Sequence, residues 1–505
     1  MNRHHKRRRF AALAACVGST AALAVLGSAG PALATVPCRT GGFASGSSFQ
    51  GTAQQTVWLL GTSWGTHSSC TVAPTSSTIT YTKSASGPGL EEFGNGTGVL
   101  DATQDPVAFT SGSETKDAAG QVLDWFTGSD DAPTPFELGE ARVASGAKNP
   151  AEITIPVAQA PVSVLLSLPL SCKIVSGSAV DINTTTVPQI WEGSNPPSGS
   201  DPGGIHAQGG YAIATWGALL TQLGYTKITS GTPEAGQFLD EGGATGCEQT
   251  IKPQVRQLAS GTSFAFKSYL SQVDRPLWAG YANDNVTWPS SAVVQSDPKT
   301  PPAEGSQNND SGGHLSQDTA DTPGSIGYAN TADAANAGNG GFTNAATSST
   351  FGVGGSTSPH QILYAEVQNN GFNPVGATYA DSLLPASSIA NCESTKLLPS
   401  DTGFPYSYTD SWFGLLVSDP NISADAGSTD YPICAITYDL VWHHYSNGNL
   451  FGKTETAHEV ANTVHDLFEY ITNQGQIDIQ SHDYTRFPTA FAAHVHQAVT
   501  PGIGY

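Results

Sequence analysis

The sequence is poor in charged residues and in long apolar runs. Only 12% of its 505 residues are Asp, Glu, Lys or Arg, and 20 basic residues face 42 acidic ones. A surface this acidic repels nucleic acids and anionic membranes, so neither is expected as a partner. Beyond residue 34 no uncharged apolar stretch reaches the roughly 18 residues that a membrane-spanning helix needs.

Motifs that would indicate a metal or a nucleotide are missing as well. The sequence has no Walker-type phosphate loop, no H-E-x-x-H pattern and, among the cysteines after residue 34, no C-x-x-C pair. Histidines do gather in the last 65 residues, but their spacing favours a solvated polar face over a metal site. They are His443, His444, His458, His465, His482, His494 and His496. We therefore predict no metal and no cofactor.

The N-terminus has the pattern of an export signal. A basic stretch and an Ala/Leu/Val run end at Ala32-Leu33-Ala34, which predicts a signal peptide over residues 1–34. A lipid anchor at Cys16 is the less favoured alternative, because only about six apolar residues precede it. Five of the basic residues and none of the acidic ones lie in 1–34, which leaves a net charge near −27. We expect a secreted, extracellular or cell-surface protein.

Six cysteines remain after the signal, and an even number in an exported chain predicts three disulfides. Six cysteines allow 15 connectivities, which the sequence alone does not resolve. Sequential pairing is the working hypothesis, because each bond then closes a loop within one predicted lobe. The pairs are Cys38–Cys70, Cys172–Cys247 and Cys392–Cys434.

Short β-branched runs alternate with amphipathic segments, which predicts an α/β fold with mixed sheets flanked by helices. Strands are expected at 77–81, 151–156, 162–168 and 434–442, and helices at 213–223 and 457–471. The last of these is the clearest, with Val460, Val464, Leu467, Phe468 and Ile471 on one stripe. Residues 196–210 and 295–358 are interpreted as insertions, and the second, low in large apolar residues, as a surface excursion.

Four short segments rich in Gly, Ser or Thr suggest a site for an oxyanion. The first turn of a helix has unpaired N–H groups and the positive end of the helix dipole. Glycine there lets an anion approach the backbone, hydroxyls add donors, and a guanidinium adds a charged fork. The candidate residues are Ser48, Phe49, Ser86, Gly87, Asp105, Arg256, Ser260, Gly261 and Thr262.

Asp105 is the unexpected member of this set, and it suggests which anion is bound. Inorganic phosphate keeps a proton at neutral pH, whereas sulfate has none. A carboxylate can accept a hydrogen bond from that proton, while sulfate would face an unpaired acceptor of like charge. Asp105 is therefore the predicted selectivity residue. Arsenate and phosphonate remain open as ligands.

These residues resemble the periplasmic phosphate-binding proteins of high-affinity phosphate ABC transporters. The resemblance is carried by Arg256-x-x-x-Ser260-Gly261-Thr262, Gly46-x-Ser48-Phe49, Tyr81 with Ser86-Gly87, Asp105-x-x-Ala108, Pro323-Gly324-Ser325-Ile326-Gly327-Tyr328 and Tyr431-Pro432-Ile433. Two features depart from the family. Leu258 stands where an Asp is usual, and the chain is longer by roughly 100 residues or more.

The resemblance implies a two-lobed fold of the periplasmic-binding-protein type II class, with the ligand between the lobes. Lobe one would comprise 36–168 and 436–505, and lobe two 169–435. It also implies capture of inorganic phosphate without catalysis, by a monomer that delivers it to the membrane permease of an ABC transporter.

Two other functions stay open. Gly61-Thr62-Ser63-Trp64-Gly65 matches the G-x-S-x-G pattern of a hydrolase nucleophile, but that pattern requires a helix directly after it, and residues 66–70 look like a loop. A secreted phosphatase or esterase is one alternative. A surface protein that has kept the fold and lost the ligand is the other, supported by Leu258 and the insertions.

Overall fold

The computed structural model describes most of the chain after the predicted signal. The described residues belong to one structural unit, Val36–Tyr505. They are residues 35–83, 85, 86, 89, 124–130, 152–192, 213–256, 260–278, 281, 288, 294–295, 311–349, 359–371, 376–382, 392, 418–420, 422, 430–445 and 454–504. None of the helices in these ranges has the length and apolar character that crossing a bilayer requires.

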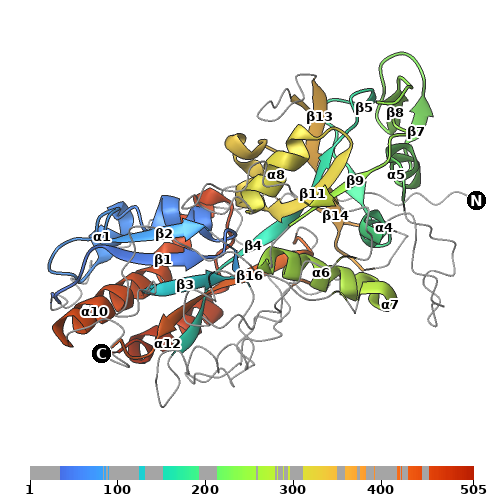
Figure 1. The fold of residues 1–505 in the computed structure, drawn as a ribbon. Coiled ribbons are helices and arrows are strands. Elements are labelled where there is room, and N and C mark those ends of the chain that lie inside the picture. Colours follow the sequence, from blue (N-terminus) through green and yellow to red (C-terminus); the bar gives the residue numbers. More distant parts are fainter. Residues whose placement is uncertain are drawn as a thin grey trace, which may run out of the picture. The chain divides into compact units, whose positions relative to one another are not determined.

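Ten of the described strands form one mixed sheet (Figure 1), in the order β10-β9-β11-β4-β16-β3-β1-β2, with β13 also paired to β4 and β12 to β13. β1, β2 and β3 are mutually parallel in their pairings, whereas β16 runs antiparallel to β3 and β4. The strands are β1 (Gly42–Gly46), β2 (Ile79–Lys83), β3 (Phe126–Ser129), β4 (Glu152–Ser167), β9 (Lys252–Val255), β10 (Val294–Gln295), β11 (Ser325–Asn330), β12 (Thr347–Ser349), β13 (His360–Tyr364) and β16 (Cys434–Trp442).

The long strand β4 joins the two sides of this sheet. It pairs with β16 from residue 152 to Pro161, and with β11 from Val162 to Ser167. The sequence predicted two strands here, 151–156 and 162–168, and the structure has one. Pro156 interrupts the pattern without ending the strand because it lies at the register shift beside Thr437 and Tyr438, where a missing N–H is tolerated.

Helices cover the sheet and bury its apolar faces. α10 (Thr454–Ile471) confirms the predicted helix at 457–471, and its stripe from Val460 to Ile471 is buried. Phe468 of this helix meets Phe126 of β3 edge to face, with ring centroids 5.4 Å apart. The helix expected at 213–223 is α5 (Trp216–Gln222). Other helices are α4 (Thr186–Glu192), α6 (Gly261–Val273), α7 (Arg275–Trp278), α8 (Gly312–Asp321), α9 (Thr331–Ala335), α11 (Gly475–Asp478) and α12 (Thr489–Gly502).

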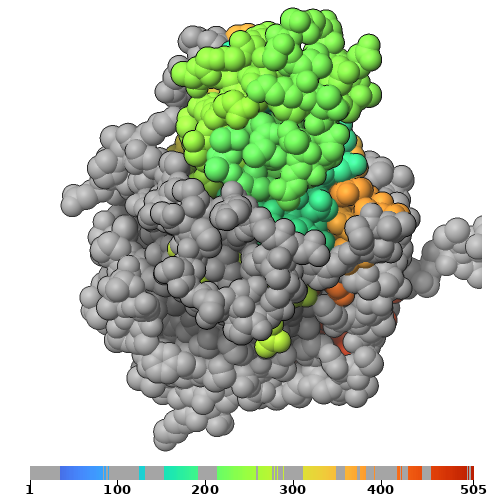
Figure 2. Space-filling view, turned by 90° about the vertical axis from the view of Figure 1, so that its right-hand side faces the viewer, coloured from blue at the N-terminus to red at the C-terminus, as the bar shows by residue number. Residues whose placement is uncertain are grey.

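Two smaller sheets complete the described architecture. One has the order β15-β14-β6, and the other β5-β8-β7. The β5-β8-β7 sheet belongs to the part of the chain that dominates the upper half of the face seen in Figure 2. The strands are β5 (Cys172–Ile174), β6 (Asp181–Ile182), β7 (Thr226–Ile228), β8 (Gln237–Asp240), β14 (Glu366–Gln368) and β15 (Tyr379–Ala380).

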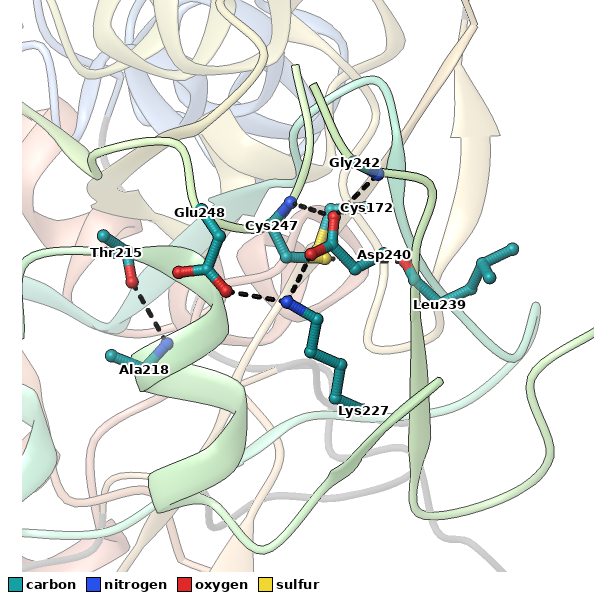
Figure 3. Close-up of polar contacts among 9 residues, drawn as sticks. All are labelled: Cys172, Thr215, Ala218, Lys227, Leu239, Asp240, Gly242, Cys247 and Glu248. Atoms are coloured by element: carbon teal, nitrogen blue, oxygen red, sulfur yellow. Dashed lines mark hydrogen bonds and ion pairs between the residues drawn. A yellow bond between two sulfur atoms is a disulfide. The ribbon is translucent and has the colours of Figure 1, made fainter. Parts of the chain in front are cut away.

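A network of polar contacts holds the loop after β8 against the Cys172–Cys247 disulfide (Figure 3). Asp240 accepts hydrogen bonds from the N–H groups of Gly242 and Cys247, both at 3.0 Å. Lys227 on β7 lies 2.6 Å from Asp240 and 2.8 Å from Glu248. All three disulfides predicted from the sequence are present: Cys38–Cys70, Cys172–Cys247 and Cys392–Cys434.

The interpretation of 295–358 as a surface excursion is wrong for residues 311–349. They form α8, β11 and α9, and all six residues of β11 are buried between β4 and β9. Small residues allow this burial, since a Cβ on Gly327 would lie only 3.0 Å from Leu315. A low content of large side chains here reflects close packing. The other insertion, 196–210, lies outside the described residues, and the lobe boundaries at 168 and 436 stay a prediction.

Candidate functional site

The turn after β1 carries the first predicted site residues. Ser47 donates its N–H to the carbonyl of Gly128 at 2.8 Å, and its hydroxyl accepts from the N–H of Phe49 at 3.0 Å. The hydroxyl of Ser48 has a different partner, because it accepts a hydrogen bond from the N–H of Gly312 at the start of α8, at 3.2 Å. Ser48 and Phe49 are both buried. The turn therefore presents its polar groups to the interior of the protein.

Ser86 lies beyond the end of β2 and connects two other elements. Its hydroxyl accepts from the N–H of Asp130 at 3.0 Å and from the N–H of Gly261 at 3.3 Å. Gly261 is the first residue of α6, so Ser86 contacts one of the orphan donors of that helix. The structure thus places this predicted residue between Asp130 and the start of α6. Its neighbour Gly87 is outside the described residues.

Arg256 follows the end of β9 and reaches across to the turn after β1. Its Nη1 donates to the hydroxyl of Ser260 at 3.0 Å and lies 3.5 Å from the hydroxyl of Ser48. Only 2% of the arginine surface is exposed. A guanidinium does not lose its proton when buried, so its full positive charge lies inside the protein. Leu258 lies outside the described residues.

Asp130 is a site residue that the sequence analysis missed. It comes directly after β3, and its carboxylate accepts a hydrogen bond from the hydroxyl of Ser47. Thr262 on α6 donates to its other oxygen at 3.2 Å. No sequence signal marked Asp130, because the parallel pairing of β1 with β2 and β3 is what brings the carboxyl ends of these strands to one edge. Ser47, Ser86 and Asp130 all follow such ends. Asp105, the acid predicted instead, lies outside the described residues.

Burial dominates the electrostatics of this cluster. It raises the pKa of Asp130 to about 6, although the bond from Ser47, the charge of Arg256 and the bonds from Thr262 and Thr437 lower it in part. The carboxyl is therefore mostly ionised at neutral pH, beside one buried guanidinium.

Asp333 is a second buried acid close to the turn. A Cβ on Gly312 would lie 2.5 Å from its Oδ2, and Asn330 donates to the same oxygen at 2.8 Å. Burial raises the pKa of Asp333, while the charges of Lys83 and Arg256 lower it in part. Two carboxyls thus compete for one guanidinium.

We call these residues the Arg256 cluster. Its members are Ser47, Ser48, Ser86, Asp130, Arg256, Ser260, Gly261 and Thr262. They come from the ends of β1, β2, β3 and β9 and from the start of α6, and all but Gly261 are at most 4% exposed in the ranges that the structure describes. Hydroxyls, helix-start N–H groups and a guanidinium can hold an oxyanion, and the carboxylate can accept a proton from it.

The hydrolase pattern is arranged differently from a nucleophile elbow. The expectation of a loop after it is wrong at residues 66 and 67, because α1 (Thr62–His67) is helical. Ser63 lies within this helix and donates to Asp478. That acid also accepts from Tyr470 at 2.7 Å. Within the described part of the chain, no histidine ring nitrogen bonds the Ser63 hydroxyl, and the ring of His67 faces the Ser63 carbonyl at 3.0 Å.

Some of the histidines near the C-terminus lie close to one another, since His465 and His496 both approach Glu469, at 3.7 and 3.4 Å. His443 bonds the carbonyl of Gly502 at 2.5 Å, and His496 bonds Thr472 at 3.0 Å. Over the residues that the structure describes, no three His, Cys, Asp or Glu side chains are grouped to hold a metal ion.

Comparison with solved structures identifies the fold. One similar structure is a high-affinity periplasmic phosphate-binding protein (PfluDING) bound with phosphate, with a TM-score of 0.50, 15% identity, and coverage of 93% of this chain and 99% of that one. An ancestral soluble variant of the human phosphate-binding protein has the same TM-score of 0.50, the same 15% identity, and the same coverage of 93% of this chain and 99% of that one. The sequence matches no family profile and no curated protein significantly. At this identity the likeness establishes the fold, and it confirms the predicted α/β class of the periplasmic-binding-protein type.

Proposed function

We propose that this chain captures inorganic phosphate at the Arg256 cluster and releases it unchanged. The observation that carries the proposal is convergence. Ser48, Ser86 and the segment from Arg256 to the start of α6 are distant in the sequence, yet hydrogen bonds link them directly or through Asp130. Structures of the same fold that are named as phosphate-binding proteins support this choice of ligand.

The cluster suits an anion within an acidic protein because every attraction in it is local. The chain carries a net charge of −22, so long-range fields oppose the approach of phosphate. Arg256 supplies a buried charge, and charge-assisted hydrogen bonds to it are stronger than neutral ones. The N–H groups of Gly261 and Thr262 begin a helix of 13 residues, whose dipole favours an anion.

Asp130 takes the selectivity role that the sequence analysis gave to Asp105. A carboxylate near phosphate repels it, unless it accepts the proton that phosphate retains at neutral pH. Sulfate has no such proton and would leave the buried acceptor facing a second anion. Because the pKa of Asp130 is about 6, the carboxylate form is available at neutral pH. We expect Asp130→Asn to bind sulfate better and phosphate worse.

The wider setting of the proposal follows from the sequence. The predicted signal and three disulfides favour an exported protein. Delivery to the permease of an ABC transporter, and a monomeric state, are part of the proposal. A chromogenic phosphomonoester should not be turned over, and sustained turnover at this cluster would contradict capture without catalysis.

The decisive experiment is a calorimetric titration with phosphate and with sulfate. The wild-type protein should bind phosphate and show a rise in melting temperature that equal sulfate does not give. Arg256→Gln should abolish both signals. Arg39→Gln is the matched control, because Arg39 is 46% exposed and pairs with Glu459 at 3.5 Å, in a surface ion pair of small energetic value. Phosphate binding by Arg256→Gln equal to wild type would rule out the site.

A further inference from the structure

A chain of buried amides lies under the turn that carries Ser48. Gln50 donates from Nε2 to the carbonyl of Tyr438 on β16 at 3.1 Å, and its Oε1 accepts from Nε2 of Gln54 at 2.9 Å. The same Nε2 of Gln54 donates to Oδ2 of Asp439 at 3.0 Å. Gln50, Gln54 and Asp439 are fully buried. These contacts tie the turn and the helical segment after it, η1 (Ala53–Trp58), to the middle of β16.

The direction of this chain is fixed from one end. A backbone carbonyl only accepts hydrogen bonds, so the side of Gln50 that faces Tyr438 must be its nitrogen. The oxygen of Gln50 then faces Gln54, which must donate a hydrogen bond to it from its own nitrogen. Reversing either amide would place two acceptors in contact. The nitrogen of Gln54 is therefore the group that points at Asp439.

Two acceptors are left over at the end of the chain. In the part of the protein that the structure describes, neither Oε1 of Gln54 nor Oδ1 of Asp439 has a hydrogen-bond partner, and both atoms are buried. A carboxylate and an amide oxygen can only accept, so two unpaired acceptors would remain in the core and would destabilise the fold. A single proton on Oδ1 of Asp439 would give both atoms a partner, because a neutral acid can donate a hydrogen bond to Oε1 of Gln54.

We propose that Asp439 is a neutral carboxylic acid at neutral pH. Its proton closes a cyclic acid–amide pair with Gln54, and this pair positions the turn that carries Ser48. Oδ1 donates to Oε1 of Gln54, while Nε2 of Gln54 donates to Oδ2. Asp439 is then a positioning residue, because it acts on the Arg256 cluster through Gln54 and Gln50. The positioning role rests on the proposed function, whereas the protonation state does not.

The surroundings of Asp439 favour the neutral form. Burial raises its pKa well above the usual range, and the nearby amides of Gln50 and Gln54 only partly lower it. Its register partners are Gly128 on β3 and Ile155 on β4, neither of which is charged. The titratable group that interacts with it is Tyr81 on β2, whose own pKa is raised by burial and by the charge that Asp439 would carry.

The first test measures protonation without any ligand. The infrared spectrum of the wild type near neutral pH should contain the carbonyl band of a protonated acid, and Asp439→Asn should lack it. The ratio of the unfolding constants of wild type and Asp439→Asn should also rise about tenfold per pH unit from about pH 5 to neutral pH. This follows because the unfolded acid ionises while the folded acid keeps its proton. A ratio that levels off below neutral pH, or absence of the band, would refute the neutral acid.

Asp466→Asn is the matched control for replacing a buried carboxyl by an amide. Asp466 accepts from Nε1 of Trp64 at 2.8 Å, and from the N–H and the hydroxyl of Ser69 at 2.6 and 2.7 Å. An amide nitrogen there would meet N–H donors that cannot reverse. We expect Asp466→Asn to be less stable than wild type, while Asp439→Asn is more stable near neutral pH.

The second test measures positioning through phosphate affinity. Asparagine reproduces the cyclic pair with Gln54 and leucine does not, so Asp439→Asn should keep its Kd within about threefold of wild type and Asp439→Leu should weaken it at least about tenfold. Asp466→Asn should lose stability and keep its Kd. Wild-type affinity in Asp439→Leu would refute positioning. Absence of phosphate binding by the wild type would instead refute the proposed function, while the infrared and pH results would still decide the protonation state.

Discussion

Replacing Asp130 by asparagine should stabilise the unliganded protein above about pH 6. Burial raises the pKa of this carboxyl from 3.8 to about 6, so the ionised form is less favourable in the folded protein than in the unfolded one. The difference is about 2 pKa units, which corresponds to about 3 kcal/mol at neutral pH. Asparagine carries no charge and keeps an oxygen for one of the two hydroxyls, of Ser47 or of Thr262, while its amide nitrogen can donate to the other hydroxyl.

The pH dependence gives the sign of this effect. Below about pH 4 the carboxyl is protonated in the folded and the unfolded protein, and the charge contributes nothing. Between about pH 4 and about pH 6 only the unfolded state releases the proton, so the wild type loses stability relative to Asp130→Asn. Above about pH 6 both states are ionised and the difference stays near 3 kcal/mol.

The assay is urea unfolding of both proteins in buffers free of phosphate and sulfate, from about pH 4 to about pH 8. Anions must be excluded because a ligand of the folded state would stabilise it by mass action. A difference that is constant over this range, or one that favours the wild type more as the pH rises, would show that the buried carboxyl does not oppose folding.

Three further outcomes follow from the geometry. Gly261→Ala should weaken phosphate binding and destabilise the protein by about 1–3 kcal/mol, because its Cβ would lie 2.7 Å from the Asp130 main chain. A phosphate affinity from calorimetry and a free energy of unfolding equal to those of the wild type would contradict this. Replacing Cys172 and Cys247 together by serine should cost about 4 kcal/mol in urea unfolding, since the bond closes a separation of 75 residues, and an unchanged midpoint would contradict it. Burial would raise the pKa of Asp240, but hydrogen bonds from Lys227 and from backbone N–H groups outweigh burial and lower the pKa. Asp240→Asn should therefore be less stable than the wild type above about pH 4, and the difference should vanish as the pH falls and the wild-type carboxyl is protonated. A difference that persists in acid would contradict the pairing.

One buried acid within the Arg256 cluster and a second one beside it illustrate why a stable core and a binding site conflict. Asp130 and Asp333 both have raised pKa values because they are buried. Neither residue is placed where it would maximise stability, because burial disfavours the ionised form of each carboxyl. Such a cost is expected where a protein holds polar groups in position for a ligand.

Local sequence patterns determined the elements and the cross-links. The stripe from Val460 to Ile471 specifies a helix because its spacing is helical, and the run from Cys434 to Trp442 specifies a buried strand. An even number of cysteines predicted three disulfides, and the structure confirms the working hypothesis of sequential pairing within each predicted lobe. The motif from Arg256 to Thr262 placed a charge and a helix start next to each other in the chain. Each of these signals is contained within one short segment or one count.

What the tertiary structure decided is how separate segments meet. Asp130 is a common turn residue until the parallel pairing of β1, β2 and β3 brings it beside Ser47 and Thr262. Asp439 lies in a strand whose other residues are mostly apolar, and its need for a proton becomes apparent only when Gln54 faces it. Composition cannot reveal either feature, because the energy of a buried charge depends on neighbours that are far away in the chain.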